Sequence, residues 1–239
     1  MDSKRTVEAI ILGAFLCAGL VILGFLIFSS AIKIKSLDRT VTVKGLSERE
    51  VPANIAIWPI KFSEADNDLS NLYSVVQKKA DIIIEFLKKH GFTDDDISIS
   101  AIAIIDRQAQ GYGDSSKIKY RYSANSTITV YSKKVDTVRN TMKNLFELGK
   151  QGIAIAGQDY QTRSQFLFTN LNEIKPEMIE EATKNARKVA VKFAKDSNSK
   201  LGKIKKARQG QFSINDRDSN TPYIKKVRVV STLEYYLSD

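Results

Sequence analysis

The stretch AIILGAFLCAGLVILGFLIF, residues 9–28, divides the chain into two parts of different character. It has no charged residue over about twenty positions, and at roughly 1.5 Å per residue a helix of this length crosses the ~30 Å hydrocarbon core of a bilayer. The sequence after it is polar, periodic and punctuated by turn residues. We therefore expect a short N-terminal segment (1–8), a transmembrane signal anchor (9–32), a linker (33–38) and one folded domain (39–239).

A cleaved signal peptide and a buried core helix are the alternatives to this anchor. Signal peptides usually have an apolar stretch of only about 7 to 15 residues, although Ser29 and Ala31 offer a small-x-small cleavage site. A core helix is normally shorter and has a polar face. Cys17 lacks the small residues that precede a lipid-acceptor cysteine. The sequence favours a retained anchor, without lipidation, and leaves cleavage open.

The charges that flank the apolar stretch do not fix its orientation. Lys4 and Arg5 precede it, whereas Lys33, Lys35 and Arg39 follow it. This distribution does not favour an external domain under the positive-inside rule, but a long domain can be translocated regardless of such charges.

The composition is basic and almost free of cysteine. The chain has 37 Lys and Arg against 27 Asp and Glu, a formal net charge of +10. From Lys175 onward there are 15 basic and 8 acidic residues. Such a charge attracts anionic lipids and acidic partners. With Cys17 as the sole cysteine, an intramolecular disulfide and a cysteine metal cluster are excluded.

The C-terminal region therefore contains a candidate surface for an anionic ligand. Basic and aromatic residues alternate in 117–122 and 223–228, a pattern that suits anionic polymers but also arises when lysines of a strand simply face water. Lipid or polysaccharide is the expected ligand, and nucleic acid is not favoured. The candidate residues are Lys205, Lys206, Arg208, Lys225, Lys226 and Arg228.

Periodicity predicts strands and a helix in the first half of the domain. Residues 40–43 and 54–62 are β-branched and apolar, and we expect them to form a hairpin. Residues 68–90 have an apolar stripe at three- and four-residue spacing and should form a helix that Gly91 ends. Residues 97–105 are expected to form a strand that pairs with 119–131.

The second half should contain two helices and further strands. A helix is expected over 134–148, extended chain over 153–169, a strand over 202–212, a polar loop over 215–221 and an alternating strand over 223–237.

The longest helix of the domain should begin near Pro176, with acidic residues in its first turn and lysines near its end. Its predicted buried stripe is Ile179, Ala182, Ala186, Val189, Ala190 and Phe193. Neighbouring strands with short connections favour antiparallel pairing, and amphipathic helices must cover a sheet. The expected fold class is α+β, a mainly antiparallel sheet covered by helices.

The segment TVTVKGLSEREVPANIAI, residues 40–57, resembles the opening of the SIMPL domain family, whose pattern is an apolar strand, V-x-G, a turn and V-x-P-D-x-A. The matching residues are Val43, Gly45, Val51, Pro52 and Ala56, while Ala53 stands where the family commonly has Asp. The resemblance continues in order through 86–100, 122–130, 180–204 and 227–237. It covers about residues 38 to 238.

Bacterial members of this family are exported or membrane-anchored envelope proteins, associated with oxidative or other stress, with no established catalytic centre. The resemblance implies an inner-membrane protein with a single span and a periplasmic domain. We expect a non-enzymatic protein without cofactor or metal that acts through protein contacts, as a homo-oligomer. The alternative is a binding module for an anionic envelope ligand.

Residues that could carry chemistry have simpler structural roles. His90, the only histidine, is expected to lie at a helix end, and Asp94, Asp95 and Asp96 to cap a turn. Gly111 to Gly113 lacks the remaining residues of a phosphate-binding loop. A hydrolase that uses Glu64 and Asp66 would require two close carboxylates with a raised pKa.

Overall fold

The computed structural model describes residues 2–36, 39–109, 119–157 and 162–238. The chain forms two compact units, which we describe separately. Unit 1 consists of Met1–Glu48, Lys175–Phe212 and Arg228–Asp239, and unit 2 consists of Arg49–Ile174 and Ser213–Val227. The expected boundary of a single domain at 39–239 stays a prediction; the two units divide this range between them, and unit 1 also includes the residues before it.

The N-terminal helix α1 spans Asp2–Ser36. Within it, Ile10–Ile32 has a mean hydropathy of 2.9, and none of this segment is buried against the rest of the protein. A helix of this length and composition is compatible with a membrane anchor and with a signal sequence.

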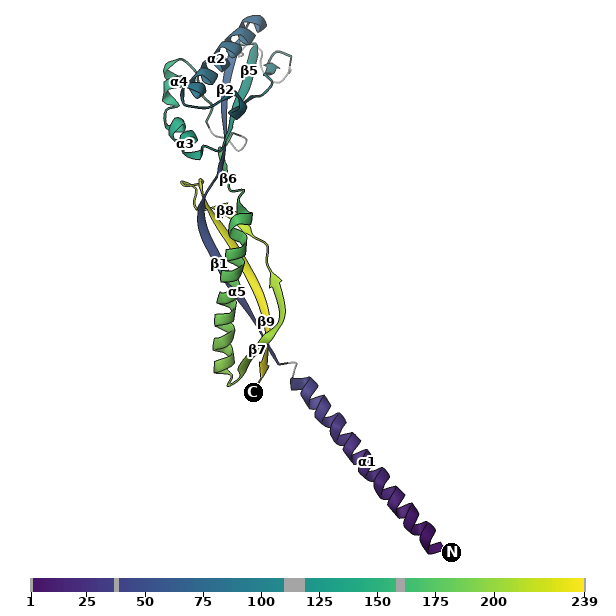
Figure 1. Ribbon diagram of the computed structural model, residues 1–239. Coiled ribbons are helices and arrows are strands. Elements are labelled where there is room, and N and C mark those ends of the chain that lie inside the picture. Colours follow the sequence, from purple (N-terminus) through teal and green to yellow (C-terminus); the bar gives the residue numbers. More distant parts are fainter. Residues whose placement is uncertain (1, 37–38, 110–118, 158–161, 239) are drawn as a thin grey trace. The chain divides into compact units, whose positions relative to one another are not determined.

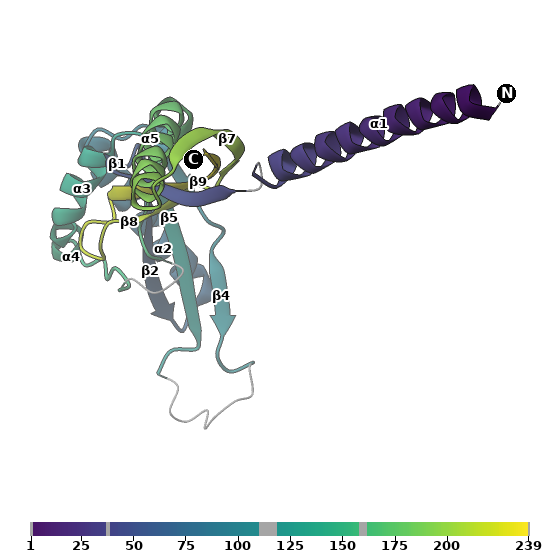
Figure 2. The ribbon, with the colours of Figure 1, turned by 90° about the horizontal axis from the view of Figure 1, so that it is seen from below.

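The sheet of unit 1 has the strand order β1, β9, β7 (Figure 1). These strands span Thr40–Pro52, Ile224–Ser238 and Lys200–Gln209. A fourth strand, β8 (Ser213–Asp216), pairs with β9, and its residues belong to unit 2. Strands β7 and β9 are antiparallel. Helix α5, Leu171–Asp196, lies along β1 and β9 (Figures 1 and 2).

Helix α5 packs on the sheet through small side chains. Its buried residues are Met178, Ala182, Ala186, Ala190 and Ala194. The predicted stripe was therefore wrong at Val189 and Phe193, which are 38% and 54% exposed.

The reason lies at Gly45 of β1. A Cβ atom on this glycine would overlap the carbonyl oxygen of Ala182 and the amide nitrogen of Ala186, and would lie 2.9 Å from the Ala186 Cβ atom. Helix and strand are thus in backbone contact, so only alanine fits the face of α5 between them.

The sheet of unit 2 has the strand order β3, β5, β2, β6, and β4 also pairs with β5. Figure 2 shows β2, β5 and β4 of this sheet. The strands are β2 (Ile55–Asp66), β3 (Ile97–Ile99), β4 (Ala103–Asp106), β5 (Tyr122–Ser132) and β6 (Gln165–Leu167). Strand β2 is antiparallel to β5 and β6, and β5 is antiparallel to β3 and β4. The longest of these pairings joins β2 to β5 from Ala56↔Ser132 to Asp66↔Tyr122. Together with the helices, this confirms the predicted α+β class.

Helix α2, Leu69–Lys89, covers this sheet and supplies much of its core. Asp68 caps its first turn by accepting a hydrogen bond from the Asn71 amide at 2.9 Å, and Gly91 follows its end with a φ of 92°. The other helices are α3 (Val135–Lys143), α4 (Phe146–Lys150) and the 3₁₀ turn η1 (Asp94–Asp96). The core contains large side chains, among them Trp58, Phe62, Leu72, Ile83, Leu87 and Ile128.

The predicted hairpin of the first two strands was wrong. Strand β1 belongs to the sheet of unit 1 and β2 to that of unit 2. The two residues between them have different partners, because the Ala53 amide donates to the Tyr223 carbonyl and the Asn54 amide to the Leu167 carbonyl, both at 2.8 Å. The polar residues expected in a turn instead continue β1, with Gly45 and Ser47 buried.

Other predicted elements were right in kind and wrong in extent. The strand expected over 97–105 is divided into β3 and β4, and Ser100 between them bonds Thr127 through both its amide and its side chain. The helix expected over 134–148 is interrupted at Asn144, and α5 begins at Leu171, before Pro176. Part of the segment 153–169 lies outside the described residues.

Candidate functional site

The predicted basic surface is divided between the two units. Lys205, Lys206, Arg208 and Arg228 belong to unit 1, while Lys225 and Lys226 belong to unit 2. Lys205 lies 3.6 Å from a Glu234 carboxylate oxygen, so its charge is partly matched. All six candidates therefore lie on strands β7 and β9, but Lys225 and Lys226 are on the part of β9 that belongs to unit 2.

Lys206 and Arg208 line a hollow on this sheet. Lys206 of β7 is paired in register with Glu234 of β9, and Arg208 with Thr232. With Thr42 of β1 they enclose about 190 Å³. Thr42, Thr232 and Glu234 alternate with the residues that α5 buries, so the hollow lies on the face of the sheet opposite to α5. An anion here would meet two cations, two hydroxyls and one carboxylate.

Lys225 has a structural role in unit 2. It is only 7% exposed, and its ammonium group forms an ion pair with Asp216. Its charge is therefore already matched within the unit.

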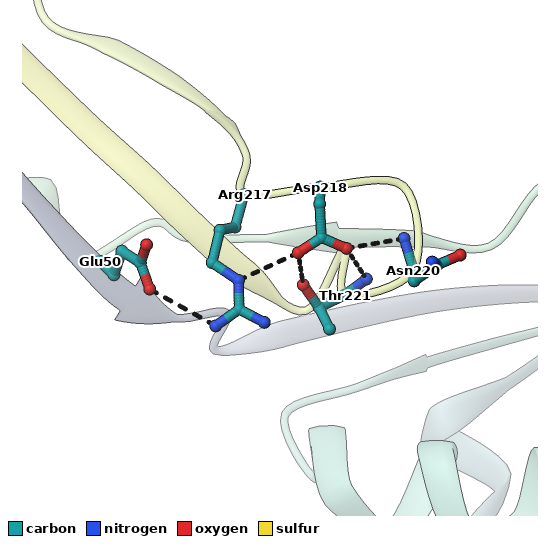
Figure 3. Close-up of polar contacts among 5 residues, drawn as sticks. All are labelled: Glu50, Arg217, Asp218, Asn220 and Thr221. Atoms are coloured by element: carbon teal, nitrogen blue, oxygen red, sulfur yellow. Dashed lines mark hydrogen bonds and ion pairs between the residues drawn. The ribbon is translucent and has the colours of Figure 1, made fainter.

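A polar network orders the loop that follows β8 (Figure 3). Arg217 donates from Nη1 to Glu50 at 3.4 Å and from Nε to Asp218 at 3.0 Å. Asp218 Oδ1 accepts the Asn220 and Thr221 amides, each at 2.8 Å, and its other oxygen accepts the Thr221 hydroxyl. One carboxylate thus holds a tight turn over 218–221.

These contacts favour the charged form of Asp218. The Thr221 hydroxyl, the Arg217 guanidinium and the two amides lower the pKa of Asp218 from 3.8 to about 2. Hydrogen bonding to Asp218 in turn raises the pKa of Arg217. The turn is therefore anchored by a carboxylate that stays ionised at neutral pH.

The ordered loop forms one wall of a cleft in unit 2. This cleft has a volume of about 500 Å³, within the usual range of small-molecule sites of about 300 to 1,000 Å³. Helix α3, the segment 163–166 and the loop 219–223 contribute its walls. The lining residues are Arg139, Met142, Lys143, Arg163, Ser164, Phe166, Ser219, Asn220, Pro222 and Tyr223.

The cleft combines positive charge with an apolar floor. The Arg139 guanidinium carbon lies 3.4 Å from the centroid of the Tyr223 ring, and Nη1 donates to Asp136 at 2.9 Å. The rings of Tyr223 and Phe166 make an edge contact at 6.1 Å. Met142 adds a thioether. A cation stacked on an aromatic ring is held in a fixed orientation.

The other sequence candidates have structural roles. His90 forms the C-cap of α2, and its Nδ1 lies 2.8 Å from the Phe86 carbonyl oxygen, as the cap prediction required. Asp96 accepts hydrogen bonds from the amide and the hydroxyl of Thr93 in a capping box, which confirms the capping role predicted for this acidic turn. The glycines at 111 and 113 lie outside the described residues.

The two carboxylates of the hydrolase hypothesis, Glu64 and Asp66, each bind a cationic or amide group. Glu64 forms an ion pair with Lys79. Hydrogen bonds from the Asp68 amide and the Asn71 side chain lower the pKa of Asp66. This shift is opposite in direction to the raised pKa that a general acid at this position would need. In the described part of the chain no group of three His, Cys, Asp or Glu side chains is arranged to hold a metal ion.

Sequence reasoning missed the cleft in unit 2. One partial signal exists, because Arg139, Met142 and Lys143 have the i, i+3, i+4 spacing of one helix face. The other two walls come from segments about 20 and 80 positions further along, and their proximity to α3 depends on the sheet of unit 2.

The fold defines a class of α+β proteins in which an apolar N-terminal helix precedes two small sheet-and-helix units. Residues 41–231 match the SIMPL family, described as a protein of unknown function (DUF541). The match covers more than half of the chain, and the protein belongs to the SIMPL family. Among proteins with curated functions, none matches the chain.

Proposed function

We propose that the protein is a single-pass inner-membrane protein whose SIMPL domain lies in the periplasm and acts by contact with further copies of itself, without catalysis. The apolar helix Ile10–Ile32 supports the anchor, and the family resemblance supports the periplasmic side and a part in envelope or oxidative stress. The sole thiol, Cys17, lies inside the apolar helix. Any protection from oxidants would therefore come from the assembly and not from cysteine scavenging.

The observation that carries the proposal is the apolar surface of unit 1. Val189 and Phe193 are one turn apart on α5, exposed at 38% and 54%. Exposed phenylalanine and valine side chains bury apolar area when a partner covers them. A second copy is the partner we commit to, because a membrane tether confines identical domains to one layer and raises their effective concentration.

The edge of the unit 1 sheet is a poorer contact for a like copy. Strand β7 lies at the end of the strand order and carries Lys200, Lys203, Lys205, Lys206 and Arg208. Cations on an edge strand are a common protection against edge-to-edge pairing, since two such strands repel each other. This argument favours the α5 surface over the strand edge for self-association.

The test compares two exposed phenylalanines in the full-length protein. Phe193→Glu should convert the assembly to monomers, as measured by amine cross-linking in native membranes and by sedimentation in detergent. Phe146→Glu, at a position that is 57% exposed in unit 2, is the matched control and should leave the assembly intact. A wild-type protein that is strictly monomeric in membranes would refute the proposal.

The side of the membrane needs its own experiment. External protease added to spheroplasts should digest the folded domain, and the mass of the mature chain should include α1. A domain that is protected until the cells are lysed would place it in the cytosol and overturn the periplasmic assignment.

The hollow on the unit 1 sheet favours a second function, the binding of an anionic envelope lipid or polysaccharide. Lys206 and Arg208 lie side by side there with two threonine hydroxyls, and Arg228 is exposed on β9. Retention on vesicles that contain anionic lipid should fall as salt increases. Lys206→Glu with Arg208→Glu should abolish retention, while Lys78→Glu with Lys133→Glu in unit 2 should preserve it. Equal retention of both double variants would exclude this surface.

A further inference from the structure

We propose that the cleft of unit 2 binds an organic anion that consists of a carboxylate or phosphate head and a flat or aliphatic apolar body. Arg139, Lys143 and Arg163 line the cleft, and among the described residues of its walls there is no acid. It lies entirely within unit 2, whereas the surfaces proposed for self-association and lipid binding belong to unit 1.

The head group is specified by the cations. Asp136 accepts one hydrogen bond from the Arg139 guanidinium, and the Arg139 side chain is 30% exposed. Lys143 and Arg163 are exposed, and the described part of the chain provides neither with an ion pair or a hydrogen-bond partner. Two cations without acidic partners at the rim of one cleft favour an anion, which would also accept the remaining donors of Arg139.

The apolar body is specified by the floor. Tyr223 is held between the Arg139 guanidinium and the edge of Phe166, and Met142 and Pro222 extend this apolar surface. Phe166 is 5% exposed, so the floor is anchored in the core of the unit. An inorganic ion would leave this surface in water, whereas a ring or short chain attached to the anion would cover it.

The far wall is built to stay in place. Ser219, Asn220 and Pro222 of the loop 219–223 line the cleft, and Asp218 fixes this loop through its bonds to Asn220 and Thr221 (Figure 3). A wall that is ordered before the ligand arrives reduces the entropy lost on binding.

The test uses the full-length protein in nanodiscs of zwitterionic lipid and isothermal titration. Phenyl phosphate and phenylacetate represent the two head groups, inorganic phosphate lacks the body, and benzyl alcohol lacks the charge. At least one of the two aromatic anions should bind saturably with a Kd on the order of 1 mM or below, and about tenfold more tightly than inorganic phosphate and benzyl alcohol. The tighter of the two identifies the head group.

The variants place the binding in the cleft. Lys143→Gln with Arg163→Gln should weaken the better aromatic anion by about tenfold or more, while Lys78→Gln with Lys133→Gln removes the same charge elsewhere on unit 2 and should leave the Kd unchanged. The proposal is overturned if neither aromatic anion saturates, if inorganic phosphate or benzyl alcohol binds equally well, or if the cleft variant binds like wild type. Self-association, measured in parallel, should be unaffected by the cleft variant.

Discussion

Units 1 and 2 are both a sheet covered by helices, but they are packed in opposite ways. In unit 2 the interface between α2 and the sheet is filled by large side chains such as Trp58, Phe62 and Ile83. In unit 1 the buried cluster is much smaller, and α5 approaches β1 so closely that Gly45 meets the helix backbone. The stability of unit 2 thus depends on large side chains that fill its core. The stability of unit 1 depends on the missing side chain of Gly45, where β1 touches α5.

This difference in packing accounts for the exposed apolar residues on α5 in unit 1. Because the close approach at Gly45 leaves room only for the small side chains of Ala182 and Ala186, α5 turns its alanine stripe to the sheet, and Val189 and Phe193 are exposed. Unit 2 buries large residues such as Trp58 and Phe62 in its core, and it has a cleft at the end of α3 where charged and aromatic side chains meet. We therefore expect an added methyl group to destabilise unit 1 at its helix–strand contact, and a removed methyl group to destabilise unit 2 in its core.

The largest effect is expected at Gly45. Gly45→Ala forces α5 away from β1 and should lower the free energy of unfolding by about 3 kcal/mol, the upper part of the usual range for overpacking. Urea unfolding of the full-length protein in detergent measures the loss, and hydrogen exchange should place it in unit 1. Gly149→Ala is the matched control, since a Cβ there meets no atom within 4 Å and alanine favours a helix. A harmless Gly45→Ala would refute the close approach.

Unit 2 should respond to a lost methyl group. Ile83 of α2 is fully buried at 0% exposure, and Ile83→Val leaves a cavity that should cost about 1 kcal/mol. Ile99→Val removes the same methyl group from a side chain that is 53% exposed and should change the free energy of unfolding little. Equal effects of the two substitutions would show that burial in this core is not what stabilises the unit.

These packings show what the sequence could reveal. Helix α2 was predicted with its start and its end because Asp68, the apolar stripe and Gly91 are all local signals. The alternation of β9 was confirmed for the same reason, with Val227, Val229, Leu233 and Tyr235 buried. Local chemistry determines such elements before any tertiary contact forms.

The wrong predictions concern which segments contact each other in space, and not which segments are helices or strands. Periodicity shows that β1 and β2 are strands, but it does not say which strands they pair with, so the predicted hairpin was wrong. On α5 two stripes one residue apart are both apolar, and only the contact with Gly45 selects the alanine stripe over Val189 and Phe193. The cleft of unit 2 needs three distant segments, which no local signal joins.

A smaller effect of opposite sign is expected at Tyr235 in unit 1. Its ring is 3% exposed, and within the described structure its hydroxyl has no hydrogen-bond partner. Burial also raises the pKa of this hydroxyl. Tyr235→Phe removes an unsatisfied polar group and should raise the free energy of unfolding by up to about 1 kcal/mol. Tyr131→Phe, at a position that is 49% exposed, should be neutral, and a destabilised Tyr235→Phe would reveal a partner for the hydroxyl.

The smallest effect belongs to a region of unit 2 that polar contacts hold instead of packing. The pKa of Asp218 is about 2, below its ordinary 3.8, so its contribution is fully present above about pH 4 and is lost as the pH falls through about 2. In NMR titrations of the full-length protein the Asn220 and Thr221 amide signals should move with this apparent pKa. The Thr93 amide donates to Asp96 in a separate turn, so its signal reports the titration of a different carboxylate in the same sample.

The same turn forms a wall of the cleft, so Asp218→Ala should weaken the binding of the aromatic anion without changing self-association. An unaltered Kd would show that the wall keeps its position without this carboxylate.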